Sequence, residues 1–172
     1  MRSYRIEGIV IKRKSFGEAD RILTLFTKRN GKIKVLAKGV RRITSRRGPN
    51  VELFNQVELF VHQGRTFDIL TEAQVLNSFS NIRKNLDLVG LAFHVCEIVD
   101  GLCPENQPHE RIYDLIIEIF KQLDHGLIQT FEKNVLQELG YLPKDHGQLD
   151  TTLFIEKILE RKLKTRRIIS SF

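Results

Sequence analysis

The first eighty residues alternate between apolar and polar positions with the period of two that is typical of half-buried β-strands. Short segments rich in Gly, Asn and Asp separate the runs, and the Asn-Gly pair at Asn30 favours a tight hairpin. We predict strands over residues 4–16, 21–27, 32–40, 51–62 and 66–79. Strands at roughly 8- to 12-residue spacing predict a small closed barrel. An OB-fold is the economical candidate, and a five-stranded SH3-like barrel is the alternative.

From about residue 80 the apolar positions recur at helical spacing. We predict helices over residues 81–102, 111–126, 127–140 and 149–172. The apolar face of the first helix is expected to contain Ile82, Leu86, Val89, Phe93, Cys96 and Leu102. Gly140 suits the end of a helix, and Asp150 or Thr151 suits an N-cap. The predicted fold class is α+β, with an OB-fold barrel over residues 1–79 and an all-α helical bundle over residues 80–172.

Charge is strongly segregated along this pattern. Residues 1–50 hold 15 Lys or Arg against 3 Asp or Glu, whereas residues 51–156 hold 7 against 17. Residues 157–172 hold 6 against 1, and the whole chain has a formal net charge of +7. Segregation of this size indicates a basic N-terminal surface that meets an anionic partner. An ordinary solvated face is the alternative.

The most basic stretch is AKGVRRITSRRGPN, residues 37–50, in which 5 of 14 residues are Lys or Arg and none is acidic. Contacts from such residues to phosphates dominate nucleic-acid affinity, so we predict a DNA-binding surface here and on the adjoining strands. The candidate DNA-binding residues are Arg13, Lys14, Arg21, Lys32, Lys34, Lys38, Arg41, Arg42, Arg46 and Arg47. Lys32, Lys34 and Lys38 are expected on one strand face. Asp20 is expected either to orient Arg21 or to form part of a plain turn.

Aromatic residues near the basic stretch are few, and the chain has no Trp. Tyr4, Phe16 and Phe26 are expected in the core rather than as platforms on which bases stack. We therefore expect binding to be mainly electrostatic, neutral to sequence and sensitive to salt, without a strong preference for single strands.

Sequence motifs of catalysis are missing: there is no nucleophile elbow, phosphate loop, GxGxxG or HExxH. The five histidines lack ligand spacing, and Cys96 and Cys103 suit core packing better than a metal site. The carboxylates Glu97, Asp100, Glu132 and Glu138 are interpreted as parts of solvated helix faces. We expect no enzyme activity, no cofactor and no bound metal.

Membrane and targeting signals are also missing from the pattern. No apolar run approaches the roughly 18 residues that span a bilayer, and the N-terminal stretch lacks the features of a signal peptide. We expect a cytoplasmic protein with reduced thiols.

Three stretches resemble the RecO family of bacterial recombination mediators. EGIVIKRKSFGEADRILTLFTKRNGKIKVLAKGVRR resembles its N-terminal domain, FDILTEAQVLNSF its fifth strand, and FEKNVLQELGYLP a segment of its helical domain. The resemblance implies an OB-fold joined to a helical domain, association with the bacterial nucleoid, and binding and annealing of single- and double-stranded DNA. It further implies that the protein acts with RecR to load the RecA recombinase onto DNA coated by single-strand-binding protein, whose acidic C-terminal tail is recognised. Within the matched motifs the basic positions are Arg21, Lys38, Arg41 and Arg42.

One departure from the family pattern follows the third stretch. Many relatives carry a four-cysteine zinc module there, whereas KDHGQLDTTLF contains no cysteine, so we expect a short member without the module. The last segment resembles the closing helix of the family. Its Lys164, Arg166 and Arg167 are candidate contacts to DNA or to an acidic partner, or they cap a helix end.

These observations leave three functional hypotheses. The first is a non-enzymatic DNA-binding and annealing protein of recombinational repair. The second is a protein-interaction adaptor whose basic patch reads acidic peptide tails. The third is an RNA- or ribosome-binding OB protein.

Overall fold

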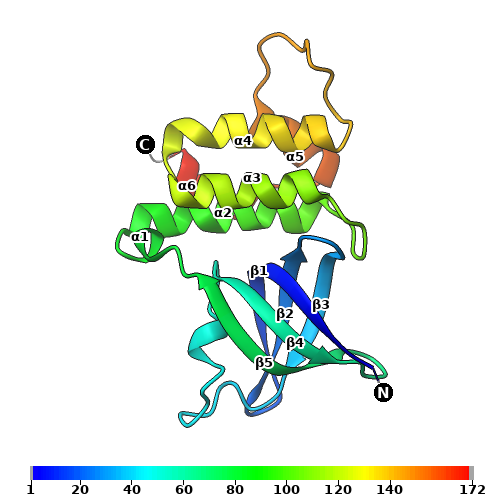
Figure 1. The fold of residues 1–172 in the computed structure, drawn as a ribbon. Coiled ribbons are helices and arrows are strands. Elements are labelled where there is room, and N and C mark those ends of the chain that lie inside the picture. Colours follow the sequence, from blue (N-terminus) through cyan, green and yellow to red (C-terminus); the bar gives the residue numbers. More distant parts are fainter. Residues whose placement is uncertain (1, 171–172) are drawn as a thin grey trace. The chain divides into compact units, whose positions relative to one another are not determined.

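The computed structural model describes residues 2–170, which form two compact units (Figure 1). The first unit contains the chain up to Ser78 together with Pro104–His109, and the second contains Phe79–Cys103 and the chain from Glu110 onward. The sequence interpretation placed Pro104–His109 in the helical domain, but the structure groups this segment with the barrel. No helix within residues 2–170 is both long and apolar enough to cross a membrane.

The first unit is a closed barrel with the strand order β1-β2-β3-β5-β4. Its strands are β1 (Ser3–Phe16), β2 (Asp20–Thr27), β3 (Gly31–Ala37), β4 (Gln56–His62) and β5 (Asp68–Asn77). All neighbours pair antiparallel except β3 and β5, which pair in parallel over only two residue pairs, Val35–Asp68 and Leu36–Ile69. The predicted five-stranded OB-type barrel followed by helices is confirmed.

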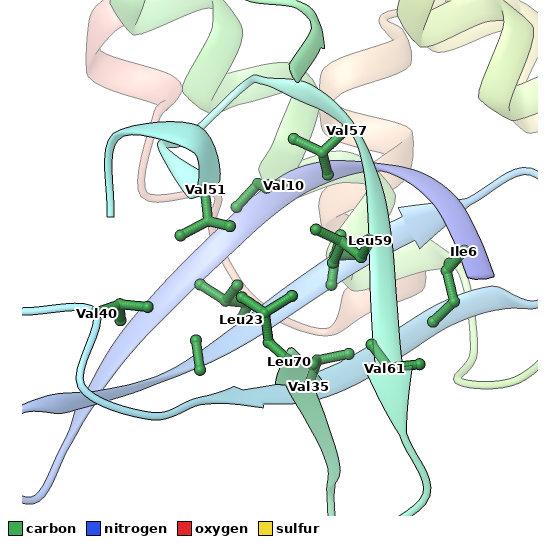
Figure 2. Packing of buried hydrophobic residues seen from close by; sticks show 12 residues of the cluster. Ile6, Val10, Leu23, Val35, Val40, Val51, Val57, Leu59, Val61 and Leu70 are labelled. Carbon is green, nitrogen blue, oxygen red and sulfur yellow. The ribbon is translucent and has the colours of Figure 1, made fainter. Parts of the chain in front are cut away.

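Side chains from all five strands meet inside this barrel (Figure 2). Leu23, Val35 and Leu59 are fully buried because alternate positions of a strand face the same side. Val40 and Val51, from the connection between β3 and β4, also point into the core (Figure 2). Complete burial of a Val or Leu side chain contributes about 1.5–3 kcal/mol to the stability of the fold. Val40 and Val51 therefore hold the connection against the barrel at two points.

The connection between β3 and β4 is longer than predicted. β3 ends at Ala37 rather than at residue 40, because Gly39 turns the chain with a φ of +67°. The predicted fourth strand over residues 51–62 begins only at Gln56. Its first part is instead a short 3₁₀-helix, η1 (Pro49–Val51), followed by an irregular segment, because Pro49 starts a helical turn well and lacks a backbone donor for a sheet.

The second unit contains six helices in the described chain: α1 (Ser80–Arg83), α2 (Leu86–Leu102), α3 (Glu110–Lys121), α4 (His125–Glu138), α5 (Thr151–Leu159) and α6 (Arg166–Ile169). Asn85 caps α2 by accepting a hydrogen bond from the Asp87 amide at 2.9 Å, so the helix predicted over residues 81–102 is two helices. Asp124 caps α4 in the same way at 2.7 Å, and α3 therefore ends at Lys121 rather than near residue 126.

The end of this unit also differs from the prediction. Asp150 caps α5 and accepts from the Leu153 amide at 3.0 Å, which confirms one of the two predicted N-caps. Gly140 has a φ of +81° just after α4, as predicted. The single helix predicted over residues 149–172 is wrong, because Glu160 adopts a φ of +54° and ends α5.

The apolar face predicted for residues 81–102 is wrong at two positions. Leu86 is 85% exposed and Phe93 is 42% exposed. Because the helix restarts after Asn85, its buried side is instead formed by residues such as Leu91, Val95 and Ile98. Cys96 and Cys103 are buried and form no disulfide, and burial, with Asp100 nearby, raises the pKa of the Cys96 thiol.

A buried polar network lies among these helices. His94, which is 0% exposed, contacts the Thr165 hydroxyl and the Glu132 carboxylate, each at 2.7 Å. Glu132 is 1% exposed and also accepts hydrogen bonds from the hydroxyls of Thr151 and Thr152. The prediction of a solvated Glu132 is therefore wrong: a helical pattern cannot reveal that His94, Thr151 and Thr152 all contact this carboxylate.

Glu97 is likewise engaged rather than solvated, and it holds the segment after α5. Its carboxylate accepts hydrogen bonds from the backbone N–H groups of Lys164 and Thr165, from the Thr165 hydroxyl and from Arg161 at 2.8–3.0 Å. Burial raises the pKa of this carboxyl, but the four donors outweigh that effect and lower the pKa to about 2.

The Glu97 interactions predict a pH-dependent stability. A lowered pKa means that Glu97 stabilises the fold above its unfolded-state pKa and that this stabilisation is lost as the pH falls toward 2. Glu97→Gln is expected to lower the free energy of unfolding at neutral pH by about 1–2 kcal/mol, with solvent screening of Arg161 limiting the effect. Urea unfolding of the wild type and of Glu97→Gln at decreasing pH should show that the difference between their free energies of unfolding becomes smaller. A difference that stays constant through the acid range would contradict this assignment.

The segment Pro104–His109 is tied to the barrel at the hairpin between β2 and β3. The Asn106 amide donates to the Lys32 carbonyl at 2.9 Å, and Glu105 pairs with Lys34. Gly31 has a φ of +70°, and a Cβ at this position would overlap the backbone of Gln107.

Gly31→Ala should therefore destabilise the protein through both backbone strain and overlap with Gln107, by about 2–4 kcal/mol. Gly17→Ala is the matched control, since Gly17 has a φ of +59° but nothing within 4 Å of the added atom. The control should cost about 1 kcal/mol, from strain alone. Thermal and urea unfolding measure both values. Equal losses of stability in Gly31→Ala and Gly17→Ala would show that Pro104–His109 does not pack closely against the hairpin.

Candidate nucleic-acid interface

The basic loop, residues 38–50, leaves the end of β3 and is held against the turn between β1 and β2. The Asp20 carboxylate accepts a hydrogen bond from the Gly39 amide at 2.7 Å. The Arg41 amide donates to the Ala19 carbonyl at 3.0 Å, and the Arg41 guanidinium donates to the Gly17 carbonyl at 3.2 Å. Asp20 thus fixes the start of the loop, rather than orienting Arg21 as one of the two predictions had it.

Arg47 anchors the middle of the basic loop. Its guanidinium donates to the carbonyls of Lys38 and Leu70, both at 2.8 Å. Lys38 follows the last residue of β3 and Leu70 lies in β5, so Arg47 bridges these two strands just beyond their two paired residues. The donors of Arg47 that face the protein are thereby used in holding the fold.

Three other basic side chains of the loop, Lys38, Arg42 and Arg46, line a hollow of about 650 Å³ together with Thr44 and Ser45. Asp20 also lines it, and its carboxylate accepts the hydrogen bond from the Gly39 amide. These three cations are exposed, and their side chains form no hydrogen bond or ion pair with the described residues. A hollow with unpaired cations and hydroxyl donors is suited to phosphate oxygens.

The remaining barrel candidates do not join this hollow. Arg13 forms an ion pair with Glu52 at 2.8 Å, and Lys34 forms one with Glu105. Lys32 is only 8% exposed and Lys38 lies beyond the end of β3, so the three lysines that were predicted on one strand face are not equally accessible. Arg21 is half-buried and is paired with Ala37, a core residue, whereas Lys14 is exposed and paired with Ile22 on the outer face of the barrel.

The aromatic residues divide three ways. Phe26 is fully buried, as predicted, but Phe16 is 47% exposed, so its predicted place in the core is wrong. Tyr4 is half-buried and donates a hydrogen bond from its hydroxyl to Asp68. Burial, together with this hydrogen bond and the charge of Asp68, raises the pKa of Tyr4 to about 12.

Two residues that the sequence analysis missed lie in the turn between β4 and β5. Arg65 is exposed and Phe67 is half-buried, and both line a second hollow, of about 320 Å³, which also includes Phe16 and Lys38. The loops of an OB-fold between the first two and last two strands commonly bind oligonucleotides, and this rule could have singled out Arg65 and Phe67.

The C-terminal candidates belong to the helical unit. Arg166 forms an ion pair with Glu156 at 2.6 Å, while the side chains of Lys164 and Arg167 are exposed. The Lys164 amide takes part in the Glu97 contacts described above. No group of three or more metal-ligating side chains occurs within residues 2–170.

A closed five-stranded barrel with a basic loop, followed by a helical unit, defines a protein of the OB-fold class. Residues 1–79 match the model of the Recombination protein O N-terminal domain, and residues 83–145 match that of the Recombination protein O C-terminal domain. The chain therefore belongs to the Recombination protein O family.

Similar proteins named DNA repair protein RecO occur in several bacteria. Those from Pelotomaculum thermopropionicum and Dehalococcoides mccartyi are 33% and 34% identical to the chain over 147 and 146 residues. The protein of Listeria welshimeri is 32% identical over 144 residues. These alignments cover 81–83% of the chain but only 56–58% of the relatives, so the chain spans little more than half of their length.

Two neighbouring arginines of the basic loop are predicted to behave differently. Arg47→Ala should lower the free energy of unfolding by about 2–3 kcal/mol, because two carbonyls lose a charged donor. Arg46→Ala, the matched control, should change it by less than about 0.5 kcal/mol. Urea unfolding measures both, and equal effects would refute the bridging role of Arg47.

Proposed function

We propose that the chain is a non-enzymatic DNA-binding protein of recombinational repair, which associates with the bacterial nucleoid. The observation that carries this proposal is the hollow of the basic loop, where three cations without protein partners are held on a fixed backbone. Membership of the Recombination protein O family supports the same role. The proposed DNA contacts are Lys38, Arg41, Arg42 and Arg46 of the basic loop, together with Lys14, which is exposed on the outer face of the barrel.

The proposed activity is to bind single and double strands and to anneal complementary strands. Annealing requires that the charge of two backbones be reduced at the same time, and a surface with excess positive charge supplies this. No covalent bond changes in such a reaction. The proposed partners are RecR, the acidic tail of single-strand-binding protein and, indirectly, RecA, which the protein would help to load onto coated DNA.

A second candidate function is that of an adaptor that binds acidic peptides, and one feature of the helical unit favours it. Leu153 and Phe154 line a mainly apolar hollow of about 600 Å³ on α5. Its charged lining residues are four basic and three acidic ones: Lys157, Arg161, Lys162, Arg166, Asp150, Glu156 and Glu160. An acidic peptide with an apolar end would match both parts of this hollow. Affinities for such a peptide and for a DNA oligonucleotide, measured in the same buffer, rank the two functions.

The combined variant Arg41→Ala with Arg42→Ala tests the DNA proposal. On a single strand, each phosphate contact adds roughly 0.7 to the steepness with which log affinity decreases as log salt increases. Loss of two contacts should therefore make this dependence shallower by about 1.4, and binding should weaken. Titration of a labelled single-stranded oligonucleotide at several salt concentrations measures this, and annealing in the same buffer should slow.

The control for this variant is Lys121→Ala with Lys144→Ala, which removes the same charge from exposed positions of the helical unit. It should leave the slope nearly unchanged. Equal slopes for the wild type and the Arg41 and Arg42 variant would refute the basic loop as the contact to DNA.

A further inference from the structure

The outer face of the barrel carries an apolar row where water-facing strands usually present polar residues. Ile22 of β2 is paired with Leu36 of β3, which is paired in turn with Ile69 of β5. Each is half-buried, whereas their chain neighbours Leu23, Val35 and Leu70 are at most 1% exposed in the core. The row therefore faces outward, and its partly exposed apolar side chains offer a surface to which a ligand can bind.

Aromatic and basic side chains frame this row. Leu36 and Ile69 line the hollow of about 320 Å³ together with Phe16 and Phe67, and Lys38 and Arg65 also line it. None of the described residues that line it carries a carboxylate. The side chains of Lys38 and Arg65 form no hydrogen bond or ion pair with the rest of the described chain.

The turn that carries Arg65 and Phe67 is fixed in place. The Asp68 carboxylate accepts hydrogen bonds from the Tyr4 hydroxyl and, at 3.3 Å, from the Gly64 amide. A Cβ on Gly64 would overlap the Phe67 carbonyl, so the turn is tightly closed. Arg65 and Phe67 are thus presented by a preorganised backbone, which lowers the cost of binding.

We propose that Phe16, Leu36, Ile69 and Phe67 form a platform for the unpaired bases of a single DNA strand, which we call the base platform. The inference rests on the proposed DNA-binding function and extends it, because it names the form of DNA that this face prefers. Lys38 lines both this hollow and that of the basic loop, so one strand can place phosphates on the cations and bases on the apolar row. The bases of a duplex are stacked inside the helix and cannot reach the platform.

The occupant follows from charge and shape together. An apolar peptide would cover the apolar row but leave Lys38 and Arg65 without anionic partners, whereas a duplex would pair with these cations but leave the row uncovered. A single strand alternates phosphate and base and meets both needs. The base platform therefore gives a preference for single strands that net charge alone does not supply.

The absence of tryptophan from the chain allows a direct test. Phe16→Trp places a single indole on the platform, and Leu76→Trp places one at a position of the same barrel that is 46% exposed but outside the hollow. Indole fluorescence is quenched when the ring stacks on a base. Quenching by a single-stranded oligonucleotide is expected for Phe16→Trp only, with little quenching by the matching duplex.

Affinity provides the second measurement. Phe16→Ser should weaken binding of the single strand by roughly tenfold and that of the duplex by less than about twofold, with the salt slope unchanged. Leu76→Ser is the control and should change neither. Because Phe16 is 47% exposed, thermal unfolding of Phe16→Ser should match the wild type, which shows that folding is intact.

The outcomes separate the two proposals. If the wild type binds DNA but Phe16→Ser weakens both forms equally, or neither, the base platform is overturned and the DNA-binding function stands. If the wild-type chain binds neither form at low salt, the DNA-binding function fails and the platform fails with it. If Phe16→Trp is quenched equally by single strand and duplex, the preference for unpaired bases is refuted.

Discussion

The barrel closes at its weakest seam through the guanidinium of Arg47. β3 and β5 share only two paired residues, and beyond them the ladder of backbone hydrogen bonds stops. Arg47 takes over at that point by donating to a carbonyl on each side of the seam. A basic side chain of the loop thus links the two strands where their pairing ends. Because one of its acceptors is the Lys38 carbonyl, the same contact also holds the start of the loop in place. The hollow of unpaired cations and the apolar row beside it both border this seam.

The two units are stabilised by different means. The barrel has a core of aliphatic side chains, supplied by alternate strand positions and by two valines of the connection between β3 and β4 (Figure 2). The helical unit adds a buried polar network in which His94, Glu132 and Glu97 are all partnered. Such a network fixes one arrangement of the packed helices, because each buried polar atom requires its own partner.

Much of the barrel could be predicted from the sequence, since the alternation in β1, β2 and β3 is regular and the Asn-Gly turn is explicit. The different roles of Arg46 and Arg47 could not be predicted, because the two residues are adjacent and chemically identical. Only the position of β5 decides that Arg47 binds backbone carbonyls while Arg46 does not. Phe16 was misplaced because alternation does not tell whether the last residue of a strand is still covered. Glu132 was misplaced because its partners lie on two other helices, α2 and α5, which are 19 or more residues away in sequence. Local pattern therefore predicted the elements, while the chemistry of the site depended on contacts between them.

The segment Pro104–His109 means that the barrel is not continuous in the chain. This segment lies between α2 and α3 in the chain but belongs to the barrel unit. Its Glu105 forms an ion pair with Lys34, and its Asn106 amide donates a hydrogen bond to the Lys32 carbonyl. A fragment cut after residue 79 would contain every strand but would lack this acidic cover. Its lysines would be unmasked, and it would present more positive charge than the intact protein does. DNA affinities measured on such an excised barrel would therefore describe a different electrostatic surface from that of the whole chain.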